Sequence, residues 1–167
     1  MTLSTPLQNT DRALDMYGFD DFERGLLAIA RHLLTSRSDP DTQAWRHAFA
    51  IAVERLGETQ GLAAAHHMSK LLHSLGQALP EDIQFNDPLC PIAREHATLD
   101  ELSLLQMLHH MRRDNTPAAR DAVDRLTGGR MDPHVIRSGL ALAHRFPSGE
   151  GRDRAKAPTQ PQLRIVS

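Results

Sequence analysis

The sequence predicts an all-α protein, a compact bundle of about six helices followed by a disordered C-terminal tail. Apolar residues recur at three- and four-residue steps from about residue 19 to residue 146, which is the spacing of one face of an α-helix. No run rich in valine or isoleucine alternates with polar residues, so nothing favours a β-sheet. We therefore expect a flexible N-terminal arm at 1–16, a helical domain at 17–146 and a tail at 147–167.

The first half of the domain divides into three predicted helices. Residues 19–37 carry an apolar stripe and begin with acidic residues, which the helix dipole favours at that end. Residues 41–57 end in Gly57, a typical helix stop. After the third helix, 59–79, the pattern fails. The connection 79–97 contains three prolines, and a connection of this length is uncommon unless it packs on the body or has a function.

The next two helices have clear start signals. Thr98 and Glu101 have the spacing of a capping box, in which each side chain accepts a hydrogen bond from the other residue's exposed backbone N–H. The following helix spans 116–127, with Thr116 as the expected cap. A proline comes directly after this threonine, at a position where its missing N–H costs nothing.

The last predicted helix, 132–146, begins with Asp132 and Pro133. Beyond it the tail has too little apolar content to offset its ordering entropy, although its last residues, QLRIVS, are a candidate docking segment. The residues expected on the inward face of this helix are Val135, Ile136, Leu140, Ala143 and Phe146.

The composition argues against several classes of protein. A net charge of −2 over 167 residues argues against a general nucleic-acid binder. The single cysteine, Cys90, excludes an internal disulfide and a cysteine-based zinc cluster, and it fits a reducing cytoplasm. The sequence shows no signal peptide and no apolar run of roughly 20 residues. We expect a cytoplasmic protein without membrane contact, and the strong preference for arginine over lysine favours a bacterial origin.

Two His-His-Met sequences, beginning at His66 and His109, raise the alternative of a metal or haem protein. Two histidines on one helix chelate an ion when they are four residues apart, whereas His66 and His73 are seven apart, about 10 Å along the axis. We therefore expect no cofactor, with the first histidine of each doublet bordering the core and the second, His67 or His110, solvated. The weaker alternative is an interhelical metal site built from His66, His73, Cys90, His96 and His109.

A DNA-binding regulator is the other alternative function. Helices 116–127 and 132–146 could form a helix-turn-helix. The connection TGGRMD is longer than the turn of that motif, and the arginines alternate with aspartates as on a solvated helix face. The residues placed where a recognition helix contacts base edges are Arg130, His134, Arg137 and Ser138.

The preferred function is that of a non-enzymatic interaction or regulatory protein, which binds a protein partner or a second copy of itself through helix faces. We do not expect an enzyme, because no phosphate loop, Gly-x-Ser-x-Gly, HExxH or CxxC motif occurs. Exposed apolar helix faces bind partners by helix-in-groove packing. The apolar residues that lie outside the stripes assigned to the core, and would need such cover, are Leu71, Leu99, Leu102 and Met107.

Overall fold

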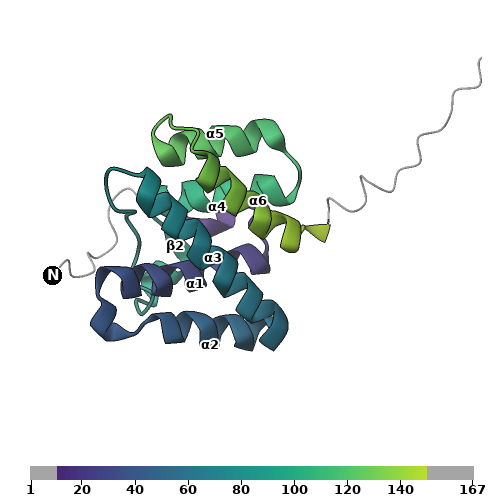
Figure 1. The fold of residues 1–167 in the computed structure, drawn as a ribbon. Helices are drawn as coiled ribbons and strands as arrows, with labels where there is room; N and C mark the ends of the chain where they lie inside the picture. Colours follow the sequence, from purple (N-terminus) through teal and green to yellow (C-terminus); the bar gives the residue numbers. More distant parts are fainter. Residues whose placement is uncertain (1–10, 150–167) are drawn as a thin grey trace, which may run out of the picture.

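The structure is a computed structural model, and it describes residues 11–149. Within this range the chain forms six α-helices, three 3-10 helices and one short two-stranded antiparallel pair (Figure 1), so the predicted all-α class is confirmed. No helix in this part of the chain is long and apolar enough to cross a membrane. The α-helices are α1 Asp21–Ser38, α2 Trp45–Leu56, α3 Glu58–Ala78, α4 Leu99–Arg112, α5 Thr116–Thr127 and α6 Pro133–Arg145.

The helices form two groups that α6 joins (Figure 1). Helices α1, α2 and α3 pack on one another, and α5 packs on α4. Helix α6 then lies across both α3 and α4. Most of the predicted helix boundaries agree with the structure to within two residues. The cap of α5 differs, because the side chain of Asn115, not of Thr116, accepts the N–H of Ala118.

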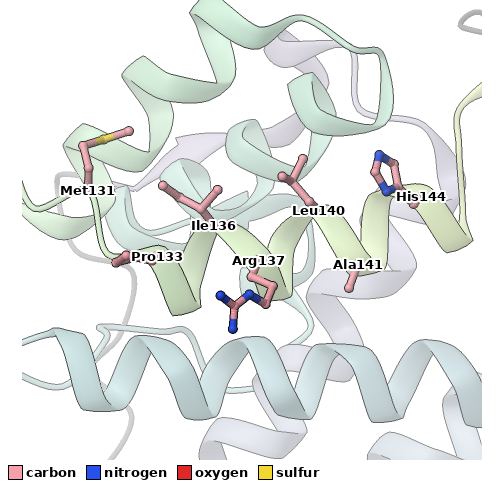
Figure 2. Close-up of a pocket in the computed structure, with 7 residues that line it drawn as sticks. All are labelled: Met131, Pro133, Ile136, Arg137, Leu140, Ala141 and His144. Carbon is pink, nitrogen blue, oxygen red and sulfur yellow. The ribbon is translucent and has the colours of Figure 1, made fainter.

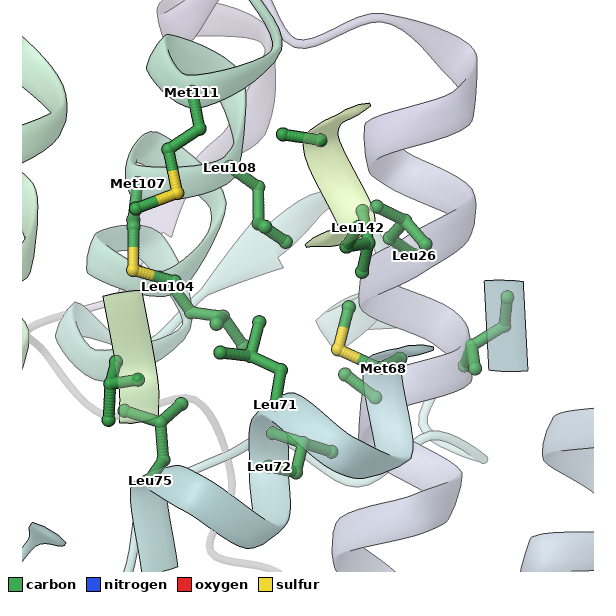
Figure 3. Close-up of a cluster of buried hydrophobic side chains, with 14 of the residues drawn as sticks. Leu26, Met68, Leu71, Leu72, Leu75, Leu104, Met107, Leu108, Met111 and Leu142 are labelled. Carbon is green, nitrogen blue, oxygen red and sulfur yellow. The ribbon is translucent and has the colours of Figure 1, made fainter. Parts of the chain in front are cut away.

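The main core lies where α6 meets α3 and α4 (Figure 3). Leu71 and Met107 are fully buried there, and Leu102 is buried in a second cluster with Leu14 and Phe19. The prediction that these residues lie outside the core is therefore wrong. The physical reason is that α3 and α4 each have neighbours on more than one side, whereas the sequence pattern assigned each helix a single buried stripe.

The segment before α1 is more ordered than the predicted arm, 1–16. Within it, β1 (Arg12–Ala13) pairs with β2 (His96–Ala97), and the 3-10 helix η1 (Leu14–Tyr17) follows directly. The reason is that Leu14, 2% exposed, closes the second apolar cluster. The rest of the arm and residues 150–167 of the predicted tail, with the QLRIVS segment, lie outside the described residues.

A buried ion pair joins α1 to the start of α4. Arg31 donates from Nε and Nη2 to the two carboxylate oxygens of Glu101, at 2.6 and 2.9 Å, and both side chains are buried. Glu101 is also a member of the capping box with Thr98, which confirms the predicted start of α4. The guanidinium further donates to the backbone carbonyls of Ala93 and His96, so the same arginine holds the long connection in place.

A second buried cluster joins the start of α1 to the end of α4. Glu23, which is fully buried, accepts hydrogen bonds from Arg112 and Arg113, each at 2.6 Å, and lies 3.0 Å from Nδ1 of His109. It also forms a capping box with Asp20. Burial raises the pKa of Asp20, but the N–H of Glu23 and the two arginines outweigh burial, so this pKa lies below its ordinary value. Helices α1 and α4 therefore run in opposite directions, and the two clusters join α1 to both ends of α4.

Removing the charge of Glu101 should destabilise the protein strongly. In Glu101→Gln the guanidinium of Arg31 stays buried without its counter-charge, and we expect a loss of about 3 kcal/mol in the free energy of unfolding, measured by urea denaturation. Glu95→Gln is the matched control, because Glu95 pairs with Arg24 on the surface and its loss should cost less than about 1 kcal/mol. Equal effects of the two substitutions would contradict this assignment.

Two glycines inside helices should respond oppositely to alanine. A Cβ atom at Gly61 would clash with the carbonyl group of Ala52, because α3 approaches the backbone of α2 closely there. We expect Gly61→Ala to lower the free energy of unfolding by about 2 kcal/mol. A Cβ atom at Gly25 would lie 3.6 Å from the nearest atoms, which belong to Arg55, and this is an ordinary contact distance. We therefore expect Gly25→Ala to raise the free energy of unfolding by up to about 1 kcal/mol, because alanine has the higher helix propensity. Thermal or urea unfolding of both variants measures this.

Candidate protein-binding groove

Helices α5 and α6 are neighbours in the sequence but do not pack together as a pair. Each rests mainly on α4, and α6 also rests on α3. Between them the structure leaves a groove of about 210 Å³ with an apolar floor and walls. The apolar residues that line it are Met111 from α4, Ala119 and Val123 from α5, Met131 from the connection, and Ile136 and Leu140 from α6.

The apolar lining continues along the outer side of α6. Ile136, Leu140 and His144 are spaced by four residues and point from the same side of the helix, with Met131 next to its start (Figure 2). Met131 is 41% exposed and Leu140 37% exposed. The expectation that Leu140 faces inward is therefore wrong.

Close packing of α6 on its other side explains why the strip is left outside. Val135, Leu142 and Ala143 are buried against α3 and α4. Gly139 allows this approach, because a Cβ atom there would lie 2.8 Å from the sulfur of Met111. Because that side of α6 faces the core and Ile136 and Leu140 are four residues apart, both side chains point toward the groove.

The turn before α6 sets the position of Met131. Gly128 and Gly129 adopt positive φ angles of 60° and 85°, which end α5. The hydroxyl of Thr127 contacts the backbone carbonyls of Val123 and Arg130. The side chain of Asp132 accepts hydrogen bonds from the N–H groups of His134 and Val135, as predicted for the start of the helix. These contacts hold the methionine at the surface between the two helices.

The charged residues that line the groove are of both signs. Asp114 lies in the turn before α5 and Arg120 lies on α5, whereas Arg137 points to the other side of α6 from Ile136 and Leu140 (Figure 2). Apolar side chains at the centre with charged side chains at the edge are the usual arrangement of a protein-binding surface. A ligand with an apolar stripe and charges of both signs beside it fits it best.

The structure places the residues of the other predicted sites on several different elements. Of the partner-binding candidates only Leu99 is exposed, at 52%, and it lies at the start of α4 away from the groove. Among the DNA-binding candidates, His134 and Arg137 are exposed, and Arg130 donates to the carbonyl of Ala78. Ser138 contacts Ser74 of α3 through its hydroxyl, so its side chain lies against α3.

The metal candidates lie apart from one another. His66 and His73 are exposed on α3, Cys90 is half-buried in the connection, and His96 contacts the carbonyl of Ile92. His109 borders the core as expected, next to Glu23. Among residues 11–149 no three His, Cys, Asp or Glu side chains are grouped to hold an ion.

The second histidine of each doublet is less solvated than expected. His67 and His110 are both half-buried, whereas His66 is exposed. Burial lowers the pKa of His67 and of His110, and the neighbouring histidine and basic residues lower it further. The pKa of His32, which is buried between α1 and α2, is also lowered by burial and then by His47.

These shifts predict that the protein loses stability on mild acidification. A histidine whose pKa in the folded state is below the unfolded value of 6.5 takes up its proton first in the unfolded chain. The stability that the neutral histidine contributes to the folded state is complete above pH 6.5, and it declines as the pH falls from there toward the pKa of the histidine in the folded state. We expect the free energy of unfolding to decrease from pH 7.5 to pH 5.5, and His32→Gln to reduce that decrease. An unchanged pH slope in this variant would contradict the assignment.

Comparisons of the chain with protein-family models, with curated proteins and with solved structures found no match. The geometry of the groove between α5 and α6 is therefore the basis on which a function can be argued.

Proposed function

We propose that the protein is a non-enzymatic interaction protein that binds one helix of a protein partner in the groove between α5 and α6. The observation that carries this proposal is the apolar strip of Met131, Ile136 and Leu140, in which Met131 and Leu140 are exposed and Ile136 is half-buried. Apolar strips of this kind on a folded domain mark interaction sites. A regulatory role in a bacterial cytoplasm is part of the same proposal, and it rests on composition alone.

Helix-in-groove packing is the mode that suits this site. The 13 residues of α6 extend about 20 Å, which matches some three to four turns of a partner helix. Residues at positions i, i+4 and i+7 of that helix would fill the space between Val123 and Leu140. An acidic residue beside them would meet Arg120 at the edge of the groove, and a basic residue would meet Asp114. The partner is therefore an amphipathic helix with charges of both signs beside its apolar stripe.

The site can be tested without knowing the natural partner. We would select peptides of about 16 residues from a displayed random library against the full chain, and then measure their affinities by fluorescence anisotropy. We expect the selected peptides to be amphipathic, with an apolar stripe flanked by charges of both signs. Leu140→Asp should lower the affinity for these peptides by about tenfold or more, because it places a charge in the apolar strip.

Leu62→Asp is the matched control for this experiment. Leu62 is 42% exposed on α3, and it does not line the groove. Its substitution should leave the affinities unchanged. Peptides that bind Leu140→Asp as well as the wild type, or a library without enrichment, would overturn the proposal. A homodimer that Leu140→Asp dissociates would put a second copy in the groove instead of a partner helix.

A further inference from the structure

We propose that residues 162–166 of the chain's own tail fold back into the groove between α5 and α6 and compete there with a partner helix. The inference rests on the proposed function, because it concerns the same groove and adds a regulation to it. The occupant lies outside the described residues and is known by its sequence, QLRIV, whereas the receiving surface is known by its geometry.

The apolar content of the tail is concentrated in a short segment. Residues 150–162, with the sequence EGRDRAKAPTQPQ, contain no apolar side chain larger than alanine or proline. Leu163, Ile165 and Val166 then follow within four positions. The sequence therefore places a polar linker before an apolar segment, and such a segment gains free energy when it removes apolar surface from water.

The structure fixes the point from which the tail starts. Ser148 is buried, and its N–H donates to the backbone carbonyl of Arg112 at 3.2 Å. Nε of Arg112 in turn donates to the carbonyl of Phe146 at 2.7 Å. The chain therefore leaves the C-terminal end of α6 at a defined position, and the apolar strip of the groove lies along this same helix.

The linker has a suitable length to bring the segment to the groove. Leu140 and Ile136 lie before the end of α6 at Arg145 by about 8 and 14 Å along the helix axis. From Gly149 to Leu163 the chain extends at most about 46 Å, and its mean end-to-end distance as a flexible linker is roughly 20 Å. A tether whose mean length is close to the span gives an effective concentration on the order of millimolar. Even a weak contact is then populated.

The spacing of the segment matches the spacing of the strip. In an extended chain Leu163 and Ile165 lie on the same side, about 7 Å apart. Ile136 and Leu140 are about 6 Å apart along the axis of α6. Ile136 is half-buried and Leu140 is 37% exposed, so both have apolar surface left to cover. The two side chains of the tail can therefore pack against these two residues at once.

The charges of the segment match only part of the groove edge. Asp114 is exposed there and forms no ion pair with another of residues 11–149, so the guanidinium of Arg164 can meet it. Arg120 lines the same groove, and residues 162–166 contain no acid to pair with it. A partner helix with charges of both signs pairs with both residues. It therefore has the advantage that it needs to displace the tail.

Two double substitutions in the full chain test whether the tail occupies the groove. Leu163→Asp with Ile165→Asp removes the apolar side chains of the segment, and we expect the NMR methyl and amide signals of the apolar strip to shift because it loses its cover. Ala155→Asp with Ala157→Asp is the matched control, since it adds the same two charges at the same spacing within the linker. It should leave the signals of the strip as they are in the wild type.

The same variants measure the competition with a partner. Peptides selected against the full chain should bind the Leu163→Asp, Ile165→Asp variant about two- to tenfold more tightly than the wild type, because the groove is then free in every molecule. Their affinity for the Ala155→Asp, Ala157→Asp variant should equal that for the wild type.

Three results would overturn the inference. The first is a strip whose signals are the same in the wild type and in the Leu163→Asp, Ile165→Asp variant, and the second is an equal shift in the alanine control. The third is a difference that disappears on dilution, which would place the tail of a second copy in the groove. The NMR comparison needs no partner. Unchanged signals with intact peptide binding therefore refute this inference alone, and shifted signals without any selected peptide refute the proposed function alone.

Discussion

The structure depends on the two buried charge clusters that tie α1 to α4. Each contains a glutamate that is also part of a capping box, so a single carboxylate both starts its own helix and neutralises an arginine of the other. Taking a carboxylate and a guanidinium out of water is costly, and only close, well-satisfied geometry offsets that cost. Here the hydrogen bonds are 2.6 to 2.9 Å long and the spare N–H groups of Arg31 meet backbone carbonyls. Such pairs fix the register of two helices more specifically than leucine contacts can.

The same cluster reaches the end of α6 and so shapes the proposed binding groove. Nε of Arg112 donates to the carbonyl of Phe146 at 2.7 Å, and the N–H of Ser148 donates to the carbonyl of Arg112. Arg112 thus anchors the C-terminal end of α6 on α4, while Gly139 allows close packing near its middle. With α6 held in this way and α5 resting on α4, the apolar strip between them stays uncovered. The ion pairs therefore position the groove without contributing a residue to its lining.

Local signals in the sequence predict where the helices begin and end, but they do not predict which helices pack against one another. The capping box at Thr98, the stop at Gly57 and the start at Asp132 each depend on neighbouring residues, and the structure confirms all three. Burial of Leu71 and Met107 and exposure of Leu140 depend instead on where α6 crosses α3 and α4, which periodicity does not encode. The pairing of Glu23 with Arg112 joins residues 89 positions apart, so the sequence shows both charges without showing that they meet.

Native-state hydrogen exchange of the full chain tests most directly whether these ion pairs hold α1 and α4 together as one unit. If they do, the buried amides of both helices open in a single cooperative step with the free energy of global unfolding, and they lose protection together as denaturant is added. Amides of α1 that open at a clearly lower free energy, while those of α4 remain protected, would contradict this view of the fold.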